Sequence, residues 1–257
     1  MKKFLLLSAA LIGFSVPAYA GQDVDYVDGD MPMQGYFAPS ACENGKAAPV
    51  VYVIHQWKGL GAYEKSRADM LSGKCYNAFA VDMYGKGIRP SDAEGAKMQS
   101  SVYKGDPDLS KQRIDAARDF VESQGYTNSK DAMIGYCFGG TMALDYARAG
   151  TDIDGVVSFH GGLSTKRALN PTHPITASIQ VHHGAVDPYV PPAELESFIG
   201  EMDAADADWQ LNLYADAVHA FTEKEAGSDP STGVAYNEKA DIRSWASALA
   251  FLDEILN

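Results

Sequence analysis

The chain of 257 residues has few basic side chains: 21 Lys and Arg stand against 34 Asp and Glu, a net charge of -13. A surface this acidic repels phosphate backbones and anionic lipids, so the composition argues against nucleic acid or a membrane surface as a partner. The three cysteines are too few for a disulfide scaffold and lack the paired spacing of zinc sites. We therefore expect no metal and no cofactor.

Long hydrophobic runs are absent after the first twenty residues. Residues 4–16 form an apolar stretch that is too short to span a bilayer comfortably, and Lys2 and Lys3 precede it. Pro17 and then Ala18-Tyr19-Ala20 complete a small-residue cleavage pattern. The pattern predicts a signal peptide over residues 1–20, with an N-terminal membrane anchor as the alternative. We expect export, to the periplasm of a Gram-negative host or otherwise into the medium.

Export changes the interpretation of the cysteines, because thiols pair in oxidising compartments. Cys42 lies in a turn-rich stretch, and Cys75 lies between an expected helix and an expected strand. Cys137 lies in a different context, between two glycines. The sequence thus predicts a Cys42–Cys75 disulfide and a free Cys137, whereas three free thiols are the alternative.

The order of hydrophobic patterns along residues 21–257 alternates strand and helix, which predicts one α/β domain. Its central sheet should be mostly parallel, with helices on both faces. The last helix is expected to turn Ile242, Trp245, Leu249, Leu252 and Leu256 to the core. The expected strands are 24–27, 33–37, 50–54, 78–81, 132–134, 153–159, 179–182 and 209–214, and the other helices are 63–71, 108–124, 141–149 and 194–205.

The clearest chemical signal is Gly135-Tyr136-Cys137-Phe138-Gly139, which connects an expected strand to an expected helix. Gly-x-Cys-x-Gly has the form of a nucleophile elbow with Cys in place of Ser. The flanking glycines allow close packing of strand and helix, and a helix N-terminus favours the thiolate. A buried apolar Cys is the alternative, so the elbow needs partners to support it.

An elbow hydrolase requires an acid and then a His, each in a loop after a later strand. Asp187 follows the strand 179–182, and His219 follows the strand 209–214. Asp216 is a rival acid, but it lies three residues before His219 in the same loop. The order Cys137, Asp187, His219 therefore predicts a catalytic triad.

In this triad His219 removes the thiol proton, Asp187 orients the imidazole, and Cys137 forms an acyl-enzyme. The expected oxyanion donors are the backbone N–H groups of Phe138 and of Trp57. Trp57 belongs to the loop after the strand 50–54.

With these motifs the sequence resembles the dienelactone hydrolase family, in its exported bacterial type. The resemblance implies the α/β-hydrolase fold, the triad Cys137–His219–Asp187, and opening of the lactone ring of 4-carboxymethylenebut-2-en-4-olide. The segment 160–176 is too short for a large lid domain. The stretches that carry the resemblance are 53–60, 81–87, 135–140, 157–162, 184–188 and 218–221.

Three positions depart from the family. Gln56 replaces a Glu that helps to hold the resting thiol, while Lys86 and Glu223 occupy the places of two arginines that bind the substrate carboxylate. A carboxylate at position 223 repels an anionic lactone, so dienelactone is not the expected natural substrate. Tyr84 and His160 complete the expected pocket, although a buried core histidine is the alternative for His160.

The remaining histidines carry no metal-binding pattern. His182 and His183 are adjacent on one strand, so their side chains point to opposite faces. The sequence as a whole predicts a monomeric hydrolase of small esters or lactones. The alternatives are a thioesterase, or a catalytically weak protein that uses the same pocket to bind a small molecule.

Overall fold

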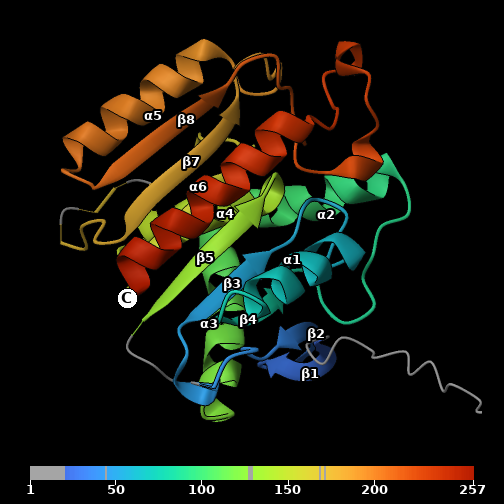
Figure 1. Cartoon of the computed structure of the whole chain (residues 1–257), viewed down its shortest axis with the longest axis vertical. Coiled ribbons are helices and arrows are strands. Elements are labelled where there is room, and N and C mark those ends of the chain that lie inside the picture. Colours follow the sequence, from blue (N-terminus) through green and yellow to red (C-terminus); the bar gives the residue numbers. More distant parts are fainter. Residues whose placement is uncertain (1–20, 44, 127–129, 168, 171) are drawn as a thin grey trace, which may run out of the picture.

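The structure of the protein, a computed structural model, describes residues 21–43, 45–126, 130–167, 169–170 and 172–257. The predicted signal peptide, residues 1–20, lies outside the described residues. Eight strands form one sheet in the order β1-β2-β4-β3-β5-β6-β7-β8 (Figure 1). The β1–β2 and β2–β4 pairs are antiparallel, and every other pair is parallel, as expected.

The predicted strands are all present, most of them with small shifts at their ends. The central strands are buried on both faces, which explains their continuous apolar sequences. The strands are β1 (Gln22–Asp28), β2 (Met31–Ala38), β3 (Val50–Ile54), β4 (Asn77–Val81), β5 (Asp131–Tyr136), β6 (Gly155–Phe159), β7 (Ser178–Gly184) and β8 (Trp209–Tyr214).

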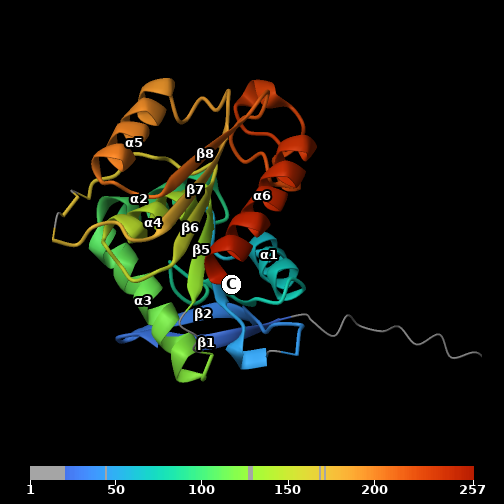
Figure 2. The same ribbon diagram turned by 60° about the vertical axis from the view of Figure 1, so that its left-hand side comes forward.

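Helices cover both faces of the sheet (Figure 2). Apolar residues of α3, α4 and α5 form the larger core on one face, and those of α1 and α6 form a second core on the other. The fold is thus the predicted α/β arrangement. The helices are α1 (Ala62–Ser72), α2 (Ala93–Gly105), α3 (Pro107–Ser123), α4 (Phe138–Arg148), α5 (Pro192–Ala204) and α6 (Glu238–Leu256).

Helix α2 was not predicted, although its sequence contains a start signal. The side chain of Asp92 caps it by accepting the Gly95 N–H at 2.7 Å. Its apolar face is weak, because Met98 and Val102 are exposed and the buried positions include Ser100. The periodicity of hydrophobic residues therefore could not reveal it.

The predicted core face of α6 is wrong at its first position. Ile242 is 62% exposed, whereas Ser244 and Ala248 are buried. Leu252 and Leu256 do face the core. The small residues Ser244 and Ala248 let the helix approach the sheet closely, so the buried stripe is rotated away from the most hydrophobic side chains.

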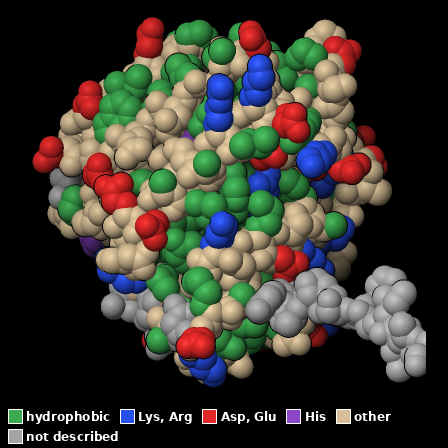
Figure 3. All heavy atoms as spheres, in the orientation of Figure 1, with side chains coloured by type: hydrophobic (Ala, Val, Ile, Leu, Met, Phe, Trp, Pro, Cys, Tyr) green, Lys and Arg blue, Asp and Glu red, His purple; other side chains and the backbone are tan. Residues whose placement is uncertain are grey.

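One face of the molecule carries its charges in a mixed pattern. Figure 3 shows acidic and basic side chains scattered over one face rather than gathered in a single patch. Among the helices in the described ranges, none has the length and apolar character needed to cross a membrane.

A disulfide joins Cys42 to Cys75, 33 residues apart in the sequence, and leaves Cys137 as a free thiol. It ties the segment before β3 to the turn after α1. Nearby, the Ser72 side chain donates to the Pro39 carbonyl at 2.5 Å. The disulfide and this hydrogen bond together hold the segment 39–43 against the end of α1.

Replacing both Cys42 and Cys75 with alanine should lower the free energy of unfolding by about 3–4 kcal/mol, because the open loop gains chain entropy in the unfolded state. Guanidinium denaturation of the two proteins measures this difference. Wild-type protein treated with dithiothreitol should unfold at the midpoint of the double variant. An unchanged midpoint after reduction would show that the bond does not contribute.

Candidate active site

The side chains singled out by the sequence meet at the carboxyl edge of the parallel strands. Cys137 follows β5, Asp187 follows β7, and His219 follows β8. In Figure 1 the arrows of these three strands point the same way, so the loops after them lie at one edge. This edge is where open α/β sheets place their ligands.

Cys137 occupies a strained turn between β5 and α4. Its φ of 53° lies in the left-handed region, which a non-glycine residue rarely adopts. The turn requires both flanking glycines. A Cβ on Gly135 would lie 2.1 Å from the Gly139 carbonyl oxygen, and one on Gly139 would lie 2.2 Å from the Ile54 carbonyl oxygen. The elbow therefore brings β5, α4 and the end of β3 into backbone contact.

Three side chains form a continuous hydrogen-bonded chain. The Sγ of Cys137 lies 3.0 Å from Nε2 of His219, and Nδ1 of His219 lies 2.9 Å from Oδ2 of Asp187. The other carboxylate oxygen of Asp187 accepts the Tyr189 N–H at 2.8 Å, which fixes the carboxylate. Asp216, the rival acid, is exposed and does not make this contact.

The electrostatics of this chain favour a thiolate and an imidazolium. Burial alone raises the pKa of the Cys137 thiol, but the facing His219, together with the Lys104 charge and the Phe138 N–H, outweighs burial and lowers this pKa below its ordinary value. Burial alone lowers the pKa of His219. The thiolate and Asp187 reverse this effect and raise the pKa to about 10. Both shifts favour the pair of thiolate and imidazolium over the pair of thiol and neutral imidazole.

The loop between β3 and α1 is fixed from several sides. His55 contacts the Gln56 carbonyl at 2.6 Å through Nδ1, while its Nε2 accepts the Met83 N–H. The Tyr84 hydroxyl donates to the Trp57 carbonyl at 2.9 Å. Burial lowers the pKa of His55 to about 4, so this side chain is neutral and structural. The loop that carries the expected donor Trp57 thus has a defined backbone.

Two expected pocket residues have different surroundings. Lys86 forms an ion pair with Asp25 of β1 and is exposed. Glu223 is half-buried, and its charge raises the pKa of the Glu64 carboxylate in α1. Neither arrangement provides the two cations that bind an anionic substrate in the family resembled.

His160 is buried and packs behind the predicted catalytic histidine. Its ring lies edge-on to that of His219, with the ring centres 5.3 Å apart. Its Nε2 contacts the Thr222 hydroxyl at 2.9 Å, and the Tyr63 hydroxyl donates to the same oxygen at 2.7 Å. Burial holds the pKa of His160 well below its ordinary value, so the ring is neutral. Its surroundings are therefore those of a supporting side chain behind His219.

Three residues near the site escaped the sequence analysis. Lys104, at the end of α2, helps to lower the pKa of the Cys137 thiol by its charge. The Tyr189 ring lies edge-on to the ring of His219 at 5.3 Å. Glu64 is a buried carboxylate at the start of α1. Lys104 belongs to the unpredicted helix, whereas a Glu at the start of a helix is usually an exposed cap.

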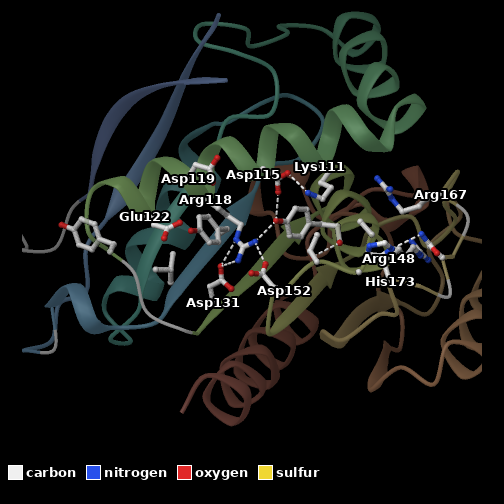
Figure 4. Close-up of a pocket in the computed structure, with 18 residues that line it drawn as sticks. Lys111, Asp115, Arg118, Asp119, Glu122, Asp131, Arg148, Asp152, Arg167 and His173 are labelled. Atoms are coloured by element: carbon white, nitrogen blue, oxygen red, sulfur yellow. Dashed lines mark hydrogen bonds and ion pairs between the residues drawn. The ribbon is translucent and has the colours of Figure 1, made fainter. Parts of the chain in front are cut away.

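A separate charged cavity of about 840 Å³ lies at the opposite edge, by the amino ends of β3 and β5 (Figure 4). Arg118 of α3 crosses it and binds Asp131, Asp152 and the Tyr146 hydroxyl at 2.8–2.9 Å. Its central cation is thus already paired. Within the described ranges, no group of three or more His, Cys, Asp or Glu side chains is arranged to hold a metal ion.

Comparisons with known proteins agree with this geometry. The profile of the Dienelactone hydrolase family matches residues 33–256. An uncharacterised protein of Caenorhabditis elegans is 36% identical over 146 residues, 56% of this chain and 92% of its own. A carboxymethylenebutenolidase of Pseudomonas putida is 25% identical over 75% of this chain and 83% of its own.

Among solved structures, a dienelactone hydrolase-like promiscuous phosphotriesterase from metagenomic libraries has a TM-score of 0.85 and 34% identity. The match covers 92% of this chain and 98% of that one. The similarity therefore extends over nearly the whole of both folds.

Alkylation of Cys137 by iodoacetamide should be rapid at pH 6–7, below the usual thiol pKa of about 8.5. Replacing His219 with alanine removes the stabilising cation but not the burial of the thiol, which raises its pKa. The labelling midpoint should then rise by about one pH unit or more. Mass spectrometry across pH 5–9 measures the rates. Asp216→Asn should label like the wild type, and equal profiles for His219→Ala and the wild type would contradict the ion pair.

Proposed function

Since the chain belongs to the dienelactone hydrolase family and is a carboxylic ester or lactone hydrolase, we propose that it acts through Cys137, His219, Asp187 and a covalent acyl-enzyme. The observation that carries the proposal is the continuous chain from Sγ through the imidazole to the carboxylate, with contacts of 3.0 and 2.9 Å. A nucleophile and base at this separation, with the base held by a third group, fit the logic of covalent acyl transfer.

In the acylation step, the Cys137 thiolate attacks the carbonyl carbon and forms the carbon–sulfur bond. The carbonyl electron pair moves to oxygen and returns when the carbon–oxygen bond of the ester breaks. The departing alkoxide takes the proton from Nε2 of His219, as general acid catalysis requires. For a lactone the alcohol stays tethered to the acyl group.

In the deacylation step, His219 is neutral and removes a proton from water. The hydroxide attacks the thioester carbon, the carbon–sulfur bond breaks, and the Cys137 thiolate leaves beside the new imidazolium. Asp187 keeps Nδ1 of His219 protonated throughout, so that Nε2 faces the reacting atoms. The resting ion pair is restored with the release of a carboxylic acid.

The developing negative oxygen is stabilised by two backbone N–H groups in this proposal. Phe138 is the first residue of α4, and its N–H already stabilises the thiolate charge of Cys137. Trp57 is the second donor, in the loop fixed by His55 and Tyr84. Removing one donor of this kind costs about 10²–10³ in kcat.

The substrate in this proposal is a small ester or lactone without a carboxylate near Glu223. Lys86 is held by Asp25, and Glu223 brings a negative charge to the position of a family arginine. A substrate carboxylate placed there is repelled. The related phosphotriesterase makes neutral phosphotriesters a useful addition to a panel of esters, thioesters and lactones.

Cys137→Ala should reduce hydrolysis across this panel by at least about a thousandfold, because the nucleophile is lost. With a slow substrate, rapid quenching and intact-mass spectrometry should detect the acyl adduct in the wild type and not in the variant. Asp216→Asn should retain wild-type rates. Hydrolysis that survives in Cys137→Ala would exclude the acyl-enzyme. Ligand binding without hydrolysis in both proteins would identify a binding protein instead.

Glu223→Gln should raise kcat/KM for an anionic lactone about three- to tenfold relative to a neutral ester of similar size, since it removes a like charge. The ratio of the two specificity constants measures the effect, and added salt should reduce it. If the two substrates change equally, Glu223 acts on the fold of the loop rather than on the substrate charge.

A further inference from the structure

Glu64 is a carboxylate in an unusual place. It is the third residue of α1, and it is only 1% exposed. Its Oε2 accepts the Gly61 N–H at 2.9 Å, which is an ordinary bond at the start of a helix. Its Oε1 accepts the Gln56 N–H at 3.2 Å, eight residues earlier in the chain. This second bond goes beyond the capping of α1.

The two N–H groups stand at the two ends of one loop. The segment 56–61 leads from β3 to α1 and includes Trp57, the proposed second oxyanion donor. Glu64 therefore holds this loop as a clamp, one oxygen at each end. His55 and Tyr84 fix its carbonyl groups, and Arg89 donates to the Leu60 carbonyl at 2.6 Å. Glu64 differs from these three side chains, because it accepts hydrogen bonds from backbone N–H groups whereas they contact carbonyl oxygens.

We infer that Glu64 is a positioning residue that sets the oxyanion loop for acyl transfer by holding the N–H groups of Gln56 and Gly61. The inference rests on the proposed function, because it assigns to the loop the donor of that mechanism. Glu64 contacts neither the thiol nor a substrate in this role. It acts through the backbone that aims the Trp57 N–H.

The clamp needs an ionised carboxylate. Each oxygen already accepts an N–H, so an added proton must weaken or displace one of these bonds. Burial is the largest influence and raises the pKa of Glu64 to about 7, although the N–H bonds oppose it. The clamp thus becomes more complete as the pH rises through about 7.

The charges around Glu64 come from several elements. Glu223, in the loop after the catalytic histidine, raises the pKa of Glu64 further. Tyr136 of β5 lies within its electrostatic reach. Arg67 of α1 is held by Asp241, and Arg89 is held by Asp82. These two cations are therefore paired elsewhere, and the carboxylate of Glu64 accepts hydrogen bonds from backbone N–H groups.

The position of this carboxylate also bears on Gln56. The dienelactone hydrolase family usually has a Glu at that position, which helps to hold the resting thiol, whereas this chain has a neutral amide. Here a carboxylate reaches the backbone of residue 56 from α1 instead. It supports the loop and leaves the thiol to His219. A carboxylate that holds the thiol and a carboxylate that supports the loop predict different results for alkylation of Cys137. Only the first should change the rate of alkylation by iodoacetamide, because this reaction uses no oxyanion hole.

The test compares Glu64→Gln with wild type, and uses Glu94→Gln as the matched control. Glu94 is an exposed first-turn glutamate of α2. At pH 8.5, Glu64→Gln should lower kcat about tenfold on the best panel substrate and change KM less than threefold. The ratio of wild-type to variant kcat should fall toward one at pH 5.5. The alkylation profile of Cys137 should stay unchanged, and Glu94→Gln should match the wild type throughout.

Either of two results in these kinetic measurements would overturn the inference. A kcat ratio that is constant from pH 5.5 to 8.5 would mean that ionisation of Glu64 does not complete the clamp. A shifted alkylation profile in Glu64→Gln would mean that Glu64 acts on the thiol. If Glu64→Gln fails to fold, Glu64→Asp replaces it, since the shorter carboxylate cannot reach both N–H groups. It should then show the same tenfold loss at pH 8.5.

Two readouts remain valid if the protein hydrolyses none of the panel, which would defeat the proposed function alone. Amide hydrogen exchange over residues 56–61 should be faster in Glu64→Gln than in Glu94→Gln, and equal exchange would overturn the clamp. The raised pKa means that ionisation opposes folding as the pH rises from about 4.5 to 7. The melting temperature of Glu64→Gln should therefore increase relative to wild type between pH 5.5 and 8.5.

Discussion

The left-handed backbone at Cys137 is the constraint on which the rest of the site depends. A non-glycine residue in this conformation costs about 1–3 kcal/mol, so the surrounding structure must enforce it. Two contacts that exclude any Cβ, at Gly135 and Gly139, bring β5, α4 and β3 together at this point. The same turn lifts the thiol above the sheet and places the first N–H of α4 beside it. The backbone strain at Cys137, the close packing of α4 and the position of the thiol therefore all follow from this one turn.

The sequence predicted the parts of this arrangement that follow from local rules. Glycine spacing, strand order and the positions just after strands were enough to indicate Cys137, Asp187 and His219, and the structure brings their side chains into contact. Those signals work because parallel strands deliver their following loops to one edge. The regular elements could be predicted for a similar reason, since buried strands have continuous apolar sequences.

The features that could not be predicted depend on tertiary contacts between residues that look ordinary in sequence. Helix α2 lacks a strong apolar face, and so Lys104 had no expected place. Ile242 has the hydrophobicity of a core residue, but the close approach of Ser244 and Ala248 leaves it in solvent. Glu64 has the position of a helix cap. Only the fold of the preceding loop turns its second oxygen toward Gln56.

The buried charges in this region follow two different physical rules. The thiolate of Cys137 and the imidazolium of His219 form an ion pair, and the carboxylate of Asp187 contacts the other side of the imidazolium. Each of these charges has a partner of opposite sign, so the groups can be ionised while buried. Glu64 accepts from backbone N–H groups instead of pairing with a cation, and burial, with a smaller contribution from the like charge of Glu223, raises its pKa to about 7. A lone carboxylate weakens the fold when it ionises, and an apolar residue of similar shape would avoid that cost. The carboxylate does what an apolar side chain cannot, because it binds an N–H group at each end of a loop and so fixes its backbone. The buried charge of Glu64 is therefore explained by the loop that it positions, and not by any gain in the stability of the fold.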